Sequence, residues 1–126
     1  MPLNLIVGWA GMVACAISGA LVGLFFHQDD WLGGYDAFRR RMVRLGHISF
    51  FGMGVMNILF AVSVSDLPAP AAYVHPASLA FVVAAVSMPI CCFLTAWHKS
   101  WRHLFPIPVI ATFAGVGLLL TGWVRA

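Results

Sequence analysis

The segment LNLIVGWAGMVACAISGALVGLFF, residues 3–26, is the clearest indication of the fold class, because it contains no Asp, Glu, Lys or Arg. At about 1.5 Å rise per residue, one helix of this length crosses a hydrocarbon core of about 30 Å. Lipid offers the backbone no hydrogen-bond partners, so the segment must form these bonds within itself. Residues 3–26 therefore predict a transmembrane helix.

Three further segments have the same character, residues 45–65, 77–97 and 104–124. The whole chain of 126 residues is 62% hydrophobic and 9% charged, whereas a soluble domain is about a quarter charged. Each segment is also longer than the roughly ten residues of a membrane barrel strand. The sequence therefore predicts a single domain, residues 1–126, that is all-α and folds as an up-and-down four-helix bundle integral to the membrane.

The basic residues predict the orientation of this bundle. Six of the seven lie in two connections, namely Arg39, Arg40, Arg41, Arg44, Lys99 and Arg102. Short loops rich in Lys and Arg stay in the cytoplasm, so four spans place both termini on the non-cytoplasmic side. Anionic headgroups attract such loops by about 1 kcal/mol per side chain, which explains the net charge of +3 without nucleic acid. We expect a bacterial inner (plasma) membrane, with the bilayer and other membrane subunits or further copies of the chain as partners.

The first basic connection has features of a surface segment. A flexible break at Gly33 and Gly34 is followed by a helix start near Asp36, and Trp31 is an interfacial anchor. We therefore expect a short helix along the membrane surface before the second span begins at residue 45. Pro76 fits the first turn of the third helix.

Small residues predict which helix faces pack together, because lipid tails provide no hydrophobic force between helices and small side chains let backbones approach. The predicted inner faces are Gly8, Gly11, Cys15, Gly19 and Gly23 on the first helix, Phe50, Gly54, Asn57 and Ala61 on the second, Ala80, Ala84, Ser87, Cys91 and His98 on the third, and His103, Ile110, Ala114, Gly117 and Thr121 on the fourth. Asn57 is the one amide near mid-membrane. We expect it to hydrogen-bond across the bundle.

Four histidines are the candidate site, because this topology brings His27, His47, His98 and His103 to one depth near the cytoplasmic face. Imidazole binds metals and haem iron. One hypothesis is a b-type haem held by His47 with His98 or His103, and with Arg44 paired to a propionate. A bare metal on His47 and His98 is a second. The third is that all four histidines anchor the helices at the headgroup level.

Two other kinds of chemistry have weaker support. Soft ligands at middle depth could form a copper(I) path, namely Met53, Met56, Met88, Cys91 and Cys92. Methionine is more often a packing residue, and the sequence has no Met-x-Met or Cys-x-x-Cys spacing. It also has no paired carboxylate and no phosphate-binding glycine loop. We therefore do not expect an enzyme acting on its own.

The small residues of the first helix point to assembly. Besides the glycine stripe, Ala10, Ala14 and Ser18 lie on a neighbouring side, which is more close-contact surface than one partner helix requires. The sequence therefore predicts a small non-catalytic membrane subunit held in a larger complex, such as a respiratory or electron-transfer complex, or in a homo-oligomer. The alternative is an electron-transfer protein that binds haem b or a metal through the histidines of the cytoplasmic side.

Overall fold

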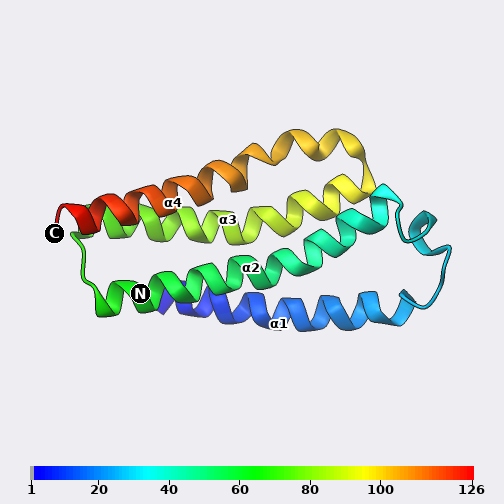
Figure 1. The fold of residues 1–126 in the computed structure, drawn as a ribbon, viewed down its shortest axis with the longest axis horizontal. Coiled ribbons are helices and arrows are strands. Elements are labelled where there is room, and N and C mark those ends of the chain that lie inside the picture. Colours follow the sequence, from blue (N-terminus) through cyan, green and yellow to red (C-terminus); the bar gives the residue numbers. More distant parts are fainter. Residues whose placement is uncertain (1) are drawn as a thin grey trace.

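The computed structural model describes residues 2–126 and shows four long helices joined by short connections (Figure 1). These are α1 (Pro2–Phe25), α2 (Phe38–Asp66), α3 (Ala71–Trp97) and α4 (Pro106–Val124), with short 3-10 helices η1 (Trp31–Gly33) before α2 and η2 (Lys99–Leu104) before α4. Each of the four is long and apolar enough to cross a membrane. The predicted all-α membrane fold is therefore confirmed.

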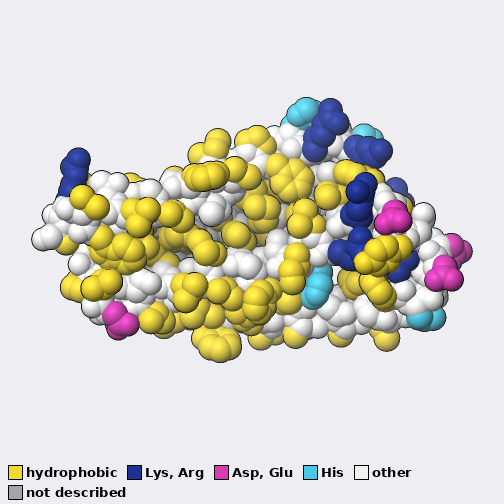
Figure 2. Space-filling view, viewed as in Figure 1, with side chains coloured by type: hydrophobic (Ala, Val, Ile, Leu, Met, Phe, Trp, Pro, Cys, Tyr) yellow, Lys and Arg dark blue, Asp and Glu magenta, His cyan; other side chains and the backbone are white. Residues whose placement is uncertain are grey.

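The helices run up and down and lie across the molecule in the order α4, α3, α2, α1 (Figure 1). Both termini and the α2–α3 connection lie at one end, here called the terminal end. The α1–α2 and α3–α4 connections lie at the other, where Lys and Arg gather, here called the basic end (Figures 1 and 2). α3 packs along α2 and α4, while α1 packs mainly on α2. Within residues 2–126, the edge helices α1 and α4 make no extended contact with each other.

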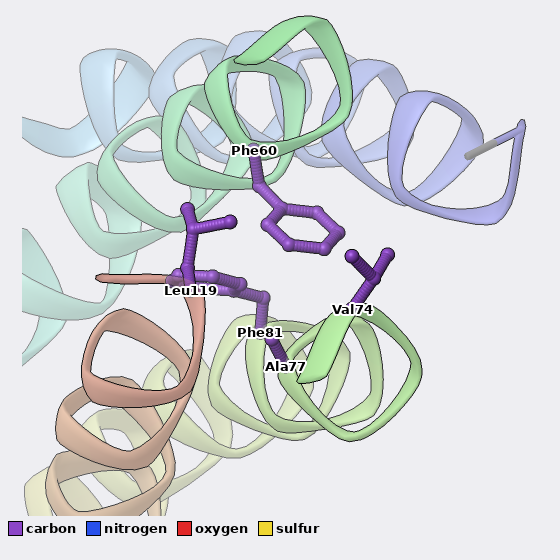
Figure 3. Packing of buried hydrophobic residues seen from close by; sticks show 5 residues of the cluster. All are labelled: Phe60, Val74, Ala77, Phe81 and Leu119. Atoms are coloured by element: carbon purple, nitrogen blue, oxygen red, sulfur yellow. The ribbon is translucent and has the colours of Figure 1, made fainter. Parts of the chain in front are cut away.

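A cluster of apolar side chains near the terminal end joins α2, α3 and α4 (Figure 3). Its members are Phe60, Val74, Ala77, Phe81 and Leu119. The ring centroids of Phe60 and Phe81 are 5.1 Å apart, with an angle of 44° between the ring planes. Such a pair contributes about 0.5–1.5 kcal/mol beyond the area it buries. Because lipid is as apolar as these side chains, close packing of this kind is what holds the helices together.

The contact between α1 and α2 is so close that it requires glycine. A Cβ added to Gly8 would lie 2.8 Å from the carbonyl oxygen of Gly54, and one added to Gly11 would lie 2.9 Å from that of Phe50. Backbone atoms cannot move aside as a flexible side chain can. The predicted inner face of the first helix is confirmed at these two glycines, whereas Gly23 has nothing within 4 Å of an added Cβ.

The second and third helices begin earlier than predicted. α2 is continuous from Phe38, so the expected surface helix is instead the first turns of α2. The reason is that Arg39 and Arg40 find backbone carbonyl groups of the protein as partners, which the sequence does not reveal. α3 begins at Ala71, which places Pro76 inside the helix and not in its first turn.

α4 turns a different face to its neighbours from the one predicted. Its buried residues are Pro108, Gly115, Leu119 and Gly122, whereas the predicted face is exposed at His103, Ile110, Ala114, Gly117 and Thr121. Large side chains of α3 determine which face of α4 packs against it. A Cβ on Gly115 would lie 3.2 Å from the ring of Phe81, and one on Gly122 would lie 3.0 Å from the Cβ of Tyr73. The glycines that contact α3 are those opposite its aromatic residues.

Candidate functional site

The loop between α1 and α2 folds around one arginine. Arg40 has only 2% of its surface exposed. Its guanidinium donates hydrogen bonds to the carbonyl oxygens of Phe26 at 2.8 Å and Gln28 at 3.1 Å. Its Cζ lies 4.9 Å from the ring centroid of Phe26, 5.4 Å from that of Trp31 and 5.6 Å from that of Tyr35. Sequence reasoning missed this role, although aromatic residues on both sides of the Gly33–Gly34 break could have signalled it.

Two neighbouring arginines also bind the backbone of the protein. Arg39 Nε donates to the carbonyl oxygen of Ala96 at 3.0 Å, near the end of α3, where carbonyl groups lack helical partners. Arg44 donates to the carbonyl oxygen of Tyr35 at 3.4 Å, and its Cζ lies 4.1 Å from the Tyr35 ring centroid. Three of the four arginines in this region therefore hold the basic end together.

His47 lies in an open groove between α1 and α2. The groove has a volume of about 510 Å³ and is lined by Gly19, Val22, Gly23, Phe26, Arg41, Arg44, Leu45, His47 and Ile48. An added Cβ on Gly19 would lie 2.8 Å from Cε1 of His47, so the imidazole rests directly on the backbone of α1. The groove therefore places one histidine and two arginines beside apolar walls, without a carboxylate in its lining.

Hydrogen bonds within the groove favour one tautomer of the neutral His47 imidazole. Ser18 Oγ lies 2.9 Å from His47 Nδ1 and donates its own proton to the carbonyl oxygen of Cys15 at 3.1 Å. A hydroxyl has a single proton, so the Ser18 oxygen is left to accept the proton of Nδ1. In this tautomer His47 Nε2 keeps the lone pair that a metal or haem iron would need.

The other candidate histidines lie elsewhere and are exposed. His98 follows the last residue of α3, and its Nδ1 contacts Ser100 Oγ at 2.5 Å and accepts from the Ser100 backbone N–H at 3.3 Å. His103 lies in η2 and His27 in the α1–α2 loop. None of the three lines the groove of His47. Residues 2–126 contain no group of three or more His, Cys, Asp or Glu side chains placed to hold a metal ion.

A polar cluster links α1, α2 and α3 near the terminal end. Asn4 and Asn57 have no exposed surface, and Ser78 has 3%. Asn4 Nδ2 donates to Asn57 Oδ1 at 2.9 Å, and Ser78 Oγ donates to Asn4 Oδ1. Asn57 Nδ2 also donates to the carbonyl oxygen of Phe81 at 3.1 Å. The predicted bond of Asn57 across the bundle is confirmed, but Asn4 was missed because its position near a helix start suggested no buried partner.

Two of the soft ligands, Cys91 and Cys92, lie among the packed side chains of α3. Cys91 and Cys92 are free thiols, and both are buried on α3. Cys92 packs on α2, because a Cβ added to Gly46 of that helix would lie 3.2 Å from the Cβ of Cys92. Their surroundings are those of packing residues.

One segment of α2, residues 44–57, connects the two ends of the molecule. It begins with Arg44 and His47 in the basic-end groove and ends with Asn57 in the polar cluster. Gly46 and Gly54 within it make close contacts with α3 and α1.

Comparisons of the chain with protein-family models, with curated proteins and with solved structures give no match.

Proposed function

We propose that this protein is a non-catalytic membrane subunit that receives a transmembrane helix of a partner subunit between α1 and α3. The observation that carries the proposal is an apolar groove of about 300 Å³ with α2 as its floor. Its lining is Val7, Ala10, Gly11, Ala14, Phe50, Gly54, Ala85 and Val86. Five of these residues are Gly or Ala. Gly11 and Gly54 already form the contact between α1 and α2, and Ala10, Ala14 and Ala85 are small residues that would let a further helix approach closely within lipid.

The rest of α1 supports this assignment by contrast. Bulky side chains point outward on its other sides, with 63% of Trp9, 58% of Val13 and 58% of Ile17 exposed, as expected for a surface that faces lipid tails. Ala10 and Ala14 interrupt this bulky surface and lie in the groove. Small residues that pack on nothing give a helix no advantage in lipid, whereas a partner helix would gain close van der Waals contact there.

Filling the groove tests the proposal. Ala14→Phe should abolish co-purification of the partner from mild detergent, while Val13→Phe, on the exposed side of the same turn, should leave it intact. Two differently tagged copies of the chain, expressed together, show whether the partner is a second copy. If the wild-type protein is a stable monomer in detergent and in nanodiscs and no partner co-purifies with it, or if Ala14→Phe assembles normally, the proposal is wrong.

We propose haem b binding at His47 as a second candidate function. The supporting observation is the hydrogen bond between Ser18 and His47, because a ligating histidine usually has its other ring nitrogen bonded in this way. Arg41 and Arg44 line the same groove and could pair with propionates. A second axial ligand would be His98 or His103 as predicted from the sequence, after a rearrangement, or a histidine of another chain.

An absorption spectrum of protein purified from haem-replete cells tests this second candidate. A Soret band should appear in the wild type, disappear in His47→Ala and persist in His75→Ala, because His75 lies on α3 near the terminal end. Replacement of His98 and of His103 one at a time shows whether either is the second ligand. A colourless wild-type protein would return the histidines to their interfacial role.

We also propose that the basic end faces the cytoplasm of a bacterial cell and that both termini lie outside. The support is the six-to-one distribution of Lys and Arg between the two ends. A reporter fused after Ala126 should be active only outside the cytoplasm. Activity of a cytoplasmic reporter at this position would reverse the orientation.

A further inference from the structure

A groove beside η2 lies apart from both surfaces discussed above. It has a volume of about 380 Å³ and is lined by Phe38, Met42, Thr95, Lys99, Arg102 and Phe105. Two of these residues are cations, none is a carboxylate, and three provide apolar walls. A ligand that fits this lining carries negative charge at one end and is apolar at the other.

The groove lies where lipid headgroups are expected. It is at the end of α3 and the start of η2, and Lys99 and Arg102 are exposed there. Nζ of Lys99 lies 5.1 Å from the ring centroid of Phe38, which keeps the ammonium group over the groove. Trp97 and Trp101 flank the site with 83% and 45% of their surfaces exposed, as in the aromatic belt of a membrane interface.

Thr95 is a second, independent sign of a ligand. It has 1% of its surface exposed, and its hydroxyl has no hydrogen-bond partner among the described residues. The hydroxyls of the other two threonines donate to the carbonyl four residues earlier, Thr112 to Pro108 at 2.8 Å and Thr121 to Gly117 at 2.7 Å. A buried polar group without a partner is rare in proteins, so the bound state of this groove is expected to supply one.

We propose that this groove binds one anionic phospholipid. Its phosphate group lies between Lys99 and Arg102, a headgroup or glycerol oxygen accepts the Thr95 proton, and an acyl chain lies along Phe38, Met42 and Phe105. A phospholipid fits the lining better than a free phosphate ion does, because half of the lining is apolar and the groove is at the level of the aromatic belt.

Native mass spectrometry of the protein in mild detergent tests this site, with phosphatidylglycerol and phosphatidylcholine of the same acyl chains as probes. The wild type should retain one phosphatidylglycerol in preference to phosphatidylcholine. Lys99→Ala and Arg102→Ala should each weaken phosphatidylglycerol binding about fivefold, and the double variant about thirtyfold. Thr95→Val should weaken both lipids alike. Arg125→Ala and Thr112→Val are the matched controls and should bind both lipids as the wild type does.

Three results would overturn the proposal. The first is equal retention of the two lipids by the wild type. The second is undiminished phosphatidylglycerol binding in the double variant, whose fold is checked by circular dichroism. The third is displacement of the lipid by inorganic phosphate at millimolar concentration, which would assign the groove to a free anion. Lys99→Arg keeps the charge and should keep the preference, which separates loss of charge from loss of fold.

Discussion

The two ends of this bundle are held by different kinds of contact. At the terminal end, neutral hydrogen bonds of Asn4 and Asn57 join three helices, and both buried residues of α1, Asn4 and Gly8, lie there. At the basic end, arginine side chains hold the loop, and the groove of His47, of about 510 Å³, and the groove beside η2, of about 380 Å³, open between the helices. Buried polar contacts between helices therefore fix the terminal end, whereas the contacts of the arginines fix the loop at the basic end.

The largest expected difference between the ends comes from two glycines of α1. Gly8→Leu should destabilise the protein by about 3 kcal/mol, because the new side chain meets the α2 backbone. Gly23→Leu should change stability by less than about 0.5 kcal/mol, because nothing lies near it. Unfolding in mixed micelles with increasing dodecyl sulfate measures both values. Equal effects of the two substitutions would contradict the comparison.

The polar cluster should give the next largest effect. Asn57→Leu leaves Asn4 Nδ2 and the Phe81 carbonyl each short of a partner, at a cost of about 2 kcal/mol in the same unfolding experiment. Asn4→Leu/Asn57→Leu should cost less than the sum of the single changes, because both groups of the lost Asn4–Asn57 hydrogen bond are then removed. Ser87→Ala is the control, since its hydroxyl bonds only the carbonyl of Val83 in its own helix. Additive single effects would show that the two amides act independently.

Arg40→Leu should act locally at the basic end. Without its guanidinium the carbonyl oxygens of Phe26 and Gln28 lose their donor, so amide exchange of residues 26–37 should rise about tenfold. The global free energy of unfolding should change by less than about 1 kcal/mol, because the terminal end is untouched. Arg41→Leu, which removes the same charge from an exposed position, should leave exchange of the loop unchanged. Loss of the whole fold in Arg40→Leu would mean that the ends are not independent.

The smallest effect is expected for Trp123, whose Nε1 donates to the carbonyl oxygen of Leu67 at 2.9 Å. This bond is exposed, so water can replace it, and Trp123→Phe should cost about 0.5 kcal/mol of unfolding free energy. Trp97→Phe, at an exposed side chain, is the comparison and should cost less. An effect of Trp123→Phe as large as that of Asn57→Leu would show that the hydrogen bond from Trp123 to Leu67 also fixes the helices at the terminal end.

Patterns of small residues predicted the helix contacts only in part. Gly8 and Gly11 face α2 as expected, because backbone approach in lipid needs glycine whatever the partner is. The prediction was wrong for α4, where Ala114 and Gly117 are exposed and Gly115 and Gly122 make the contact. Two stripes of small residues on one helix look alike in the sequence. The positions of the aromatic side chains on the neighbouring helix determine which stripe makes the contact.

Four apolar segments without charges, separated by loops with most of the Lys and Arg, are enough to assign the class of this protein. Those features depend only on composition and length, because unpaired backbone groups and charged side chains cost free energy in the hydrocarbon core whatever the tertiary structure is. Three features follow from the packing of the helices and not from the local sequence. Arg40 is buried in its own loop, Asn4 bonds to Asn57, and His47 lies on Gly19 apart from the other histidines. Each of these depends on the rotation and close approach of helices distant in sequence, which local periodicity does not encode.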